Sequence, residues 1–285
     1  MSLNYGFIVR TAVTHCPPPA RLLDFGCGAG EVVELARTAG FDSWGVDSFA
    51  DGWGGIYGHA AGQQDGRILR IVAGEPLPFD DASFDVVVTN QVFEHLKDPA
   101  ATAGEIARVL RPDGVLVAIF PTREVVIEPH LRSPFVHWFR TGSPAQKWAL
   151  RVCHWLGLSN DPRRRRNDWA DREMEALRDL VSYRDEIDTI AMFEPNFELV
   201  ARAEAALLLD RAANSRALKR FLPCLSWSRL EPVLRHACLR LAGVVLVLRV
   251  AQAPRSLVDH APSAVNTRAG VQGGPTCQHA RDSNT

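Results

Sequence analysis

The sequence predicts an α/β fold in which a doubly wound parallel sheet carries helices on both faces. The first observation is the apolar run Arg21 to Phe25, which leads into a loop with glycine at every second position and then into a predicted helix over 30–39. The second is that strand-like apolar runs alternate with helical patterns along residues 21–120. A strand, a glycine turn and a helix form the unit that cradles nucleotides in such folds, because glycine lets a ligand approach the backbone.

Composition allows one or two domains with a full hydrophobic core, since the chain has 285 residues, 46% of them hydrophobic. The formal net charge is −1, so the whole molecule is not expected to bind nucleic acid. Charge is unevenly distributed: residues 1–120 hold 8 basic and 15 acidic residues, whereas 121–170 hold 9 and 4, and 211–250 hold 8 and 1. The basic segments either meet an anionic partner or form solvated surface.

The six cysteines are scattered, without a C-x-x-C pair or metal-ligand spacing, which is typical of a reduced intracellular compartment. There is no basic stretch followed by an apolar one at the N-terminus, and no apolar run reaches the ~18 residues that a membrane-spanning helix needs. We therefore expect a cytoplasmic protein that could lie peripherally at the inner membrane surface. The sequence indicates no metal site, because Glu128, His130 and His137 lack a fourth ligand.

The glycine loop has the spacing G-x-G-x-G, with Asp24 two residues before its first glycine. A dinucleotide fingerprint would need a third glycine where Glu31 stands. A carboxylate at this position would repel a pyrophosphate, but it is compatible with a ligand that has a positive charge and no phosphate. The second predicted strand, 43–46, is followed directly by Asp47. In nucleotide-binding folds of this kind an acidic residue ~20 positions after the glycine loop, at the end of the second strand, accepts hydrogen bonds from the ribose hydroxyls. A helix cap is the alternative role for Asp47. We expect an irregular wall of the ligand cleft over the glycine-rich segment 52–66.

Three further segments follow in order. The first is Leu77-Pro78-Phe79-Asp80-Asp81-Ala82-Ser83-Phe84-Asp85, which leads into a strand at 86–88. The second is Asn90-Gln91-Val92-Phe93-Glu94-His95-Leu96-Lys97-Asp98-Pro99, whose last two residues cap and begin a helix over 99–110. The third is the turn Arg111-Pro112-Asp113-Gly114 before a strand at 115–120. Residues just past the carboxyl ends of parallel strands line the ligand crevice, which places Asn90 and Gln91 there.

Together with Asp24-Phe25-Gly26-Cys27-Gly28-Ala29-Gly30, these segments resemble the motifs of class I S-adenosylmethionine-dependent methyltransferases of the type 11-like group. The resemblance covers residues 21–120. It implies a Rossmann-like seven-stranded sheet, parallel except for one antiparallel strand, with helical insertions after strands five and six. The sixth and seventh strands are expected at 197–201 and 243–250. The chain departs from the family at Ala73, where an acidic residue often meets the adenine.

S-adenosylmethionine is the cofactor that this resemblance implies. The residues expected to bind it are Asp24, Gly26, Gly28, Gly30, Asp47, Ser48, Gly74, Glu75, Asn90 and Gln91. Asp24 and the glycine loop would hold the amino-acid part, Asp47 the ribose, and Gly74 and Glu75 the adenine in place of the missing acid. His95 and, with weaker support, His130 are candidate general bases. For His95 a structural role in its turn is the alternative.

The expected organisation is a methyltransferase domain over 1–253, with its core at 21–120, and a disordered tail at 254–285. Residues 122–170, rich in aromatic residues, histidine and proline, are expected to form a lid over the cleft or an ordinary surface insertion. A second, helical insertion at 206–240, with breaks expected at Pro223 and Pro232, is basic and leucine-rich. It packs on the core or lies on a membrane surface.

The resemblance predicts methyl transfer to the oxygen or carbon of a small, amphiphilic or lipid-linked acceptor. No N/D-P-P-Y/F tetrapeptide follows the strand at 86–88, which disfavours methylation of nucleic-acid bases. Two alternatives stay open: a non-catalytic protein that binds the cofactor or acts as a scaffold, and an NAD(P)-dependent oxidoreductase. Neither the acceptor nor the oligomeric state follows from the sequence.

Overall fold

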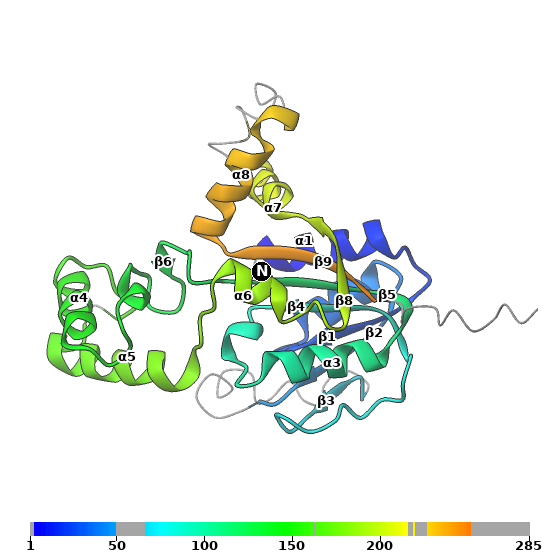
Figure 1. Ribbon diagram of the computed structural model, residues 1–285, viewed down its shortest axis with the longest axis horizontal. Coiled ribbons are helices and arrows are strands. Elements are labelled where there is room, and N and C mark those ends of the chain that lie inside the picture. The colour runs from blue at the N-terminus through cyan, green and yellow to red at the C-terminus, as the bar shows by residue number, and fades with distance from the viewer. Residues whose placement is uncertain (1–2, 50–65, 162, 216–218, 220–226, 252–285) are drawn as a thin grey trace, which may run out of the picture. The chain divides into compact units, whose positions relative to one another are not determined.

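Seven strands form one sheet in the order β3-β2-β1-β4-β5-β9-β8 in the computed structural model, which describes residues 3–49, 66–161, 163–215, 219 and 227–251 (Figure 1). The strands are β1 (Arg21–Phe25), β2 (Asp42–Asp47), β3 (Ile68–Arg70), β4 (Phe84–Asn90), β5 (Leu110–Phe120), β8 (Phe197–Arg202) and β9 (Val244–Val250). The first five pair in parallel, and β9 is antiparallel to both β5 and β8. The predicted sheet, with one antiparallel strand, is therefore confirmed.

Both faces of the sheet are buried, which explains why its central strands read as continuous apolar runs. In β5, Val115 and Val117 enter the core on one face, while Leu116 and Ala118 enter the core on the other. Helices α1 (Leu3–His15), α2 (Glu31–Thr38) and α7 (Glu204–Ala213) cover the first face, and α3 (Pro99–Val109) covers the second (Figure 1). This is the doubly wound arrangement that the sequence predicts.

Local sequence explains where the crossover helices begin. The side chain of Asp98 accepts a hydrogen bond from the Ala101 N–H at 2.9 Å, and Pro99 is the first residue of α3, as predicted. Helix α2 starts directly after Gly30, whose φ of 81° lies in the left-handed region that glycine occupies readily. The N-terminus of α2 therefore follows the glycine loop at the carboxyl edge of the sheet.

The segment after β5 builds a smaller core of its own, in addition to the two cores of the sheet. It contains β6 (Ile127–Glu128), β7 (Ser133–Pro134), η3 (Val136–Trp138), α4 (Pro144–Trp155), α5 (Arg166–Leu180) and α6 (Glu186–Ala191). Leu150 of α4 and Trp169 of α5 are completely buried in a cluster separate from the two cores of the sheet. The predicted helical insertion after the fifth strand is thus present, and Tyr183 lies in the connection between α5 and α6.

The insertion after β8 consists of α7 and α8 (Trp227–Leu241). The helix break predicted at Pro232 is wrong, because this proline lies inside α8. It is the sixth residue of α8, so it removes one hydrogen bond to the carbonyl four residues earlier without ending the helix. Among the helices described, none is long and apolar enough to cross a membrane.

Several expectations lie outside the described residues. They are the irregular wall over most of 52–66, the break at Pro223, the apolar residues Leu218, Phe221, Leu222 and Leu225 of the basic insertion, and the disordered tail at 254–285.

Candidate active site

The glycine loop connects β1 to α2 through three left-handed residues: φ is 80° at Gly26, 50° at Gly28 and 81° at Gly30. A side chain at Gly26 would also be obstructed, since its Cβ would lie 2.2 Å from Cγ2 of Val92. Val92 belongs to the turn after β4, so the loop and this turn are pressed together. The spacing of the loop is therefore a consequence of backbone conformation and of close contact.

Asp47, the last residue of β2, is directed at the glycine loop. Its Oδ2 accepts a hydrogen bond from the Gly28 N–H at 2.9 Å, and its Oδ1 accepts one from the Phe49 N–H at 2.8 Å. A carboxylate oxygen has two lone pairs, so each oxygen can accept one further bond from a hydroxyl group. Asp47 is thus held in place by backbone donors and keeps the capacity that ribose binding requires.

Asp24 lies in β1 and is only 2% exposed. Burial, with the nearby charge of Asp47 adding to it, raises the pKa of Asp24 to about 8. A buried carboxyl next to a second carboxylate favours a cationic ligand, because a positive charge stabilises the ionised form of both. The electrostatics of this corner therefore fit a cation and oppose a phosphate, as Glu31 also suggests.

The remaining predicted cofactor residues all follow strands at the same edge. Ser48 follows β2, and its carbonyl accepts a hydrogen bond from Arg70 at 3.0 Å. Gly74, with φ of 87°, and the exposed Glu75 form the turn after β3. At the end of β4, the Asn90 side chain accepts a hydrogen bond from Asn4 of α1 at 3.1 Å.

Gln91 adopts φ of 60°, which is uncommon for a residue other than glycine, while its N–H donates to the Ile119 carbonyl at 2.7 Å. Strained backbone of this kind clusters at functional sites. All ten predicted cofactor residues thus lie at the carboxyl edge of β1 to β4.

The structure brings the two predicted bases together although 35 positions separate them. His95 ends the short helix η2 (Phe93–His95), and His130 lies between β6 and β7. Their ring centroids are 5.0 Å apart. Nδ1 of His95 donates to the Leu180 carbonyl at 2.7 Å, which gives His95 a structural contact as well. The lid-like segment therefore reaches the turn that follows β4.

Glu128 organises the side of this cluster that belongs to the insertion. Its side chain is fully buried and accepts hydrogen bonds from His130 Nδ1 at 2.7 Å, from the Tyr183 hydroxyl at 2.5 Å and from the Leu131 N–H at 2.6 Å. Burial works to raise the pKa of Glu128, but the hydrogen bonds from His130 and Tyr183 outweigh it and hold this pKa below its ordinary value. Glu128 is therefore a buried, ionised acceptor.

Glu94 completes the cluster from the core side. Burial, with the charge of Glu128 adding to it, raises the pKa of Glu94 to about 8. Burial also lowers the pKa of His95, and it raises the pKa of Tyr183, next to Glu128. Sequence reasoning assigned no role to Glu94 or Tyr183. The adjacent Glu94 and His95 could have been recognised from the sequence as a possible polar site. The contact of Tyr183 with Glu128 could not, because it joins residues 55 positions apart.

A family model described as a methyltransferase domain matches residues 6–163, more than half of the chain. A ubiquinone biosynthesis O-methyltransferase of Sinorhizobium medicae is 36% identical over 96 residues, which cover 34% of this chain and 39% of that protein. An uncharacterised methyltransferase of Mycobacterium bovis is 36% identical over 137 residues, covering 44% of this chain and 54% of the relative. The chain thus spans about two-fifths to one-half of the length of these relatives.

Among solved structures, a chain from the complex between a methyltransferase and the Trm112 methyltransferase activator of Haloferax volcanii has the same fold. Its TM-score is 0.50 at 19% identity, covering 88% of this chain and 91% of that one. The family model, the motifs in residues 21–120 and the sheet order agree with one another. The chain belongs to the methyltransferase-domain family, whose members are class I enzymes that use S-adenosylmethionine.

Proposed function

We propose that this chain transfers the methyl group of S-adenosylmethionine to an oxygen or carbon atom of a small amphiphilic acceptor. The observation that carries the proposal is that one turn joins two sites. Val92 contacts the glycine loop, and two and three residues later Glu94 and His95 enter the polar cluster with His130. A cofactor held by the loop and an acceptor held by the cluster would therefore be neighbours.

The residues at the loop fit this cofactor. The buried Asp24, beside Asp47, favours the positive charges of the amino group and the sulfonium. Asp47 offers acceptor capacity for ribose hydroxyls, and the absence of Cβ atoms in the loop lets a ligand approach the backbone. When bound, S-adenosylmethionine supplies a methyl group that its sulfonium already activates.

The protein's own part in the reaction is to hold the acceptor and to accept a proton from it. Positioning a reactant at near-attack distance can be worth several kcal/mol of the barrier, about 7 or more in well-oriented cases. For a hydroxyl acceptor, the proton would pass to Nε2 of His95 or His130, because Nδ1 of each ring already donates a hydrogen bond. Glu128 orients His130 for this role.

Two observations support an acceptor with an apolar body. Large apolar side chains are exposed on the segment that carries His130: Ile127, Phe135, Trp138 and Phe139. The relative from Sinorhizobium medicae is named for ubiquinone biosynthesis, which favours transfer to oxygen. The aromatic segment would cover the acceptor's apolar part while the cluster receives its polar group.

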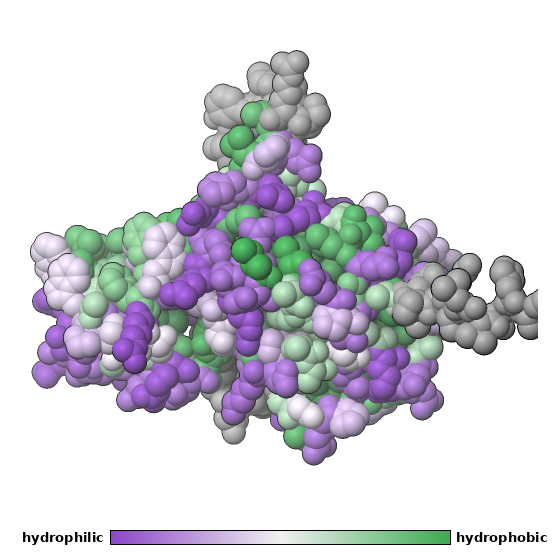
Figure 2. Space-filling model, viewed as in Figure 1, coloured by the Kyte–Doolittle hydropathy of each residue, from purple (hydrophilic) through white to green (hydrophobic). Residues whose placement is uncertain are grey.

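Peripheral contact with an anionic membrane is part of this proposal. Trp148 and Trp155 lie seven residues apart on α4, hence on one face, and are 65% and 69% exposed. Arg163 to Arg165 lie in the loop that leads from α4 to α5. In Figure 2 the region of α4 and α5, at the left, carries both green apolar and purple polar surface. Exposed tryptophan beside basic residues is typical of helices that bind a membrane interface.

The test is to incubate the purified full chain with S-adenosylmethionine carrying a deuterated methyl group and to search acceptor pools by mass spectrometry. Phenolic and quinol compounds, a lipid extract, total RNA and total protein are the pools. Labelled product in the first two supports the proposal, and label confined to RNA or protein refutes it. Cofactor binding without turnover in any pool would favour the non-catalytic alternative.

A further inference from the structure

The carboxyl group of Glu94 is buried without a hydrogen bond from the described residues. Its side chain is 0% exposed, and among the residues that the structure describes neither Oε1 nor Oε2 has a hydrogen-bond partner. Nearly all buried polar groups in proteins are hydrogen-bonded, and a buried charge is normally paired or bound to a metal. Nε2 of His95 lies 3.8 Å from Oε1 of Glu94, within ion-pair range but beyond hydrogen-bond distance, so a cation held between the two side chains would satisfy the buried carboxylate better.

Two histidines face this carboxylate, and both are oriented by bonds at the far nitrogen. Nδ1 of His95 donates to a backbone carbonyl, that of Leu180, and Nδ1 of His130 donates to the carboxylate of Glu128, each at 2.7 Å. In the neutral imidazole a proton on Nδ1 leaves the lone pair on Nε2. Histidines that bind metals almost always have such a second bond, to a carbonyl or a carboxylate.

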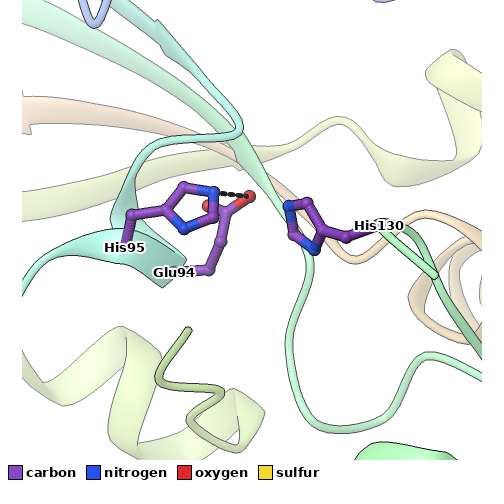
Figure 3. Close-up of side chains that lie close together, drawn as sticks. All are labelled: Glu94, His95 and His130. Atoms are coloured by element: carbon purple, nitrogen blue, oxygen red, sulfur yellow. Dashed lines mark ion pairs between the residues drawn. The ribbon is translucent and has the colours of Figure 1, made fainter. Parts of the chain in front are cut away.

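The three side chains converge from two segments, as Figure 3 shows. Glu94 Oε1 lies 3.8 Å from Nε2 of His95, and one ligand atom from each of Glu94, His95 and His130 lies within 4.8 Å of the others. Ligands around a tetrahedral ion with bonds of about 2.0–2.1 Å are roughly 3.4 Å apart. Small inward movements of these side chains would therefore close the site.

We propose that Glu94, His95 and His130 bind a divalent transition-metal cation. Two imidazoles and one carboxylate suit Zn²⁺, and also Mn²⁺ or Fe²⁺, whereas Mg²⁺ prefers oxygen ligands alone. The cation neutralises the buried carboxylate of Glu94, and Glu128 holds the ring of His130 in orientation through its hydrogen bond to Nδ1. A fourth position stays open to water or to an oxygen of a ligand, as in catalytic rather than closed structural zinc sites.

The site has a structural consequence that is independent of methyl transfer. Glu94 and His95 follow β4 in the core, while His130 belongs to the segment between β6 and β7. A bound cation would fasten the insertion to the core. It would also occupy the Nε2 atoms that the proposed function assigns as bases, so an acceptor hydroxyl at the open position would be activated by the metal instead.

The experiment is calorimetric titration of the chelator-treated full chain with ZnCl₂, MnCl₂ and MgCl₂, without cofactor or acceptor. The expected result is one equivalent of Zn²⁺ bound, with affinity lowered roughly 100-fold or more in His130→Ala and in Glu94→Gln. His154→Ala is the matched control, since this histidine of α4 is bonded to Ser159 and to the Arg164 carbonyl and should leave binding unchanged. No stoichiometric binding, or equal binding by all variants, overturns the proposal.

Substitution with Co²⁺ gives a reading that does not depend on the variants folding. The wild-type complex should show the visible absorption of cobalt in a site of low coordination number, without a thiolate charge-transfer band. A thiolate band would place the ion at one of the cysteines and overturn the assignment. Circular dichroism of each variant establishes whether a loss of binding reflects a lost ligand or a lost fold, and wild-type cobalt absorption decides the question if the variants do not fold.

Discussion

Replacement of Gly26 by alanine tests the contact between the glycine loop and the turn after β4. Two costs add at this position. A left-handed conformation costs an alanine roughly 1–2 kcal/mol, and a collision in a packed region costs typically about 1–3 kcal/mol more. The collision follows from the 2.2 Å between the added Cβ and Cγ2 of Val92. We therefore expect Gly26→Ala to lower the free energy of unfolding by about 2–5 kcal/mol.

Gly142→Ala isolates the first cost. Gly142 has φ of 75°, and a Cβ there would meet nothing within 4 Å, so only the conformational penalty of about 1–2 kcal/mol applies. Val92→Ala should relieve the second cost, because it removes both Cγ atoms and leaves Cβ of residue 92 at 3.2 Å. In a double-mutant cycle, Gly26→Ala and Val92→Ala should couple favourably by about 1–3 kcal/mol.

The assay is urea unfolding followed by circular dichroism, on the wild type, the three single variants and the double variant. Equal destabilisation by Gly26→Ala and Gly142→Ala would refute the close contact. So would strict additivity between the substitutions at 26 and 92. In either case the glycine loop would not lie against the turn that carries Glu94 and His95, and the argument that two sites adjoin would lose its support.

Three further predictions use other parts of the molecule. Burial raises the pKa of Asp24 to about 8, so this carboxyl ionises as the pH rises towards 8 and then attracts the cationic cofactor. Calorimetry should therefore find S-adenosylmethionine binding up to tenfold tighter per pH unit between pH 6 and 7.5. A similar slope in Asp24→Asn would contradict this. Arg202→Ala removes two hydrogen bonds, of 2.9 and 2.6 Å, from the fully buried carboxylate of Glu204. We expect it to lower the free energy of unfolding in urea by about 3 kcal/mol, and a loss below about 1 kcal/mol would show that the pair is dispensable. Anionic vesicles should sediment the wild type but little of Trp148→Ala/Trp155→Ala, and equal sedimentation would exclude α4 as the contact.

The sequence predicted the sheet and the cofactor edge because their signals are local. Each strand is an apolar run, and each capping or turning residue acts on neighbours within four positions, as Asp98 does at α3. Asp47 could be identified at the end of its strand because strand, loop and helix have narrow length limits. The individual roles of the ten cofactor residues stay predictions until binding is measured.

The polar cluster could be predicted only in part. His95 and His130 were identified by residue type, but their meeting depends on how the insertion packs against the core. Tyr183 reaches Glu128 across 55 positions, and no periodicity encodes such a contact. The burial of Glu94, which carries the metal proposal, also arises only in the folded chain.

Calorimetric titration of the full chain with S-adenosylmethionine, S-adenosylhomocysteine and NADH, with Asp47→Ala as the comparison, tests the central claim most directly. The account predicts binding of the first two compounds, loss of that binding in the variant, and no binding of NADH. Binding of NADH, or wild-type protein that binds neither of the other compounds, would contradict the claim that the glycine loop and Asp47 hold S-adenosylmethionine.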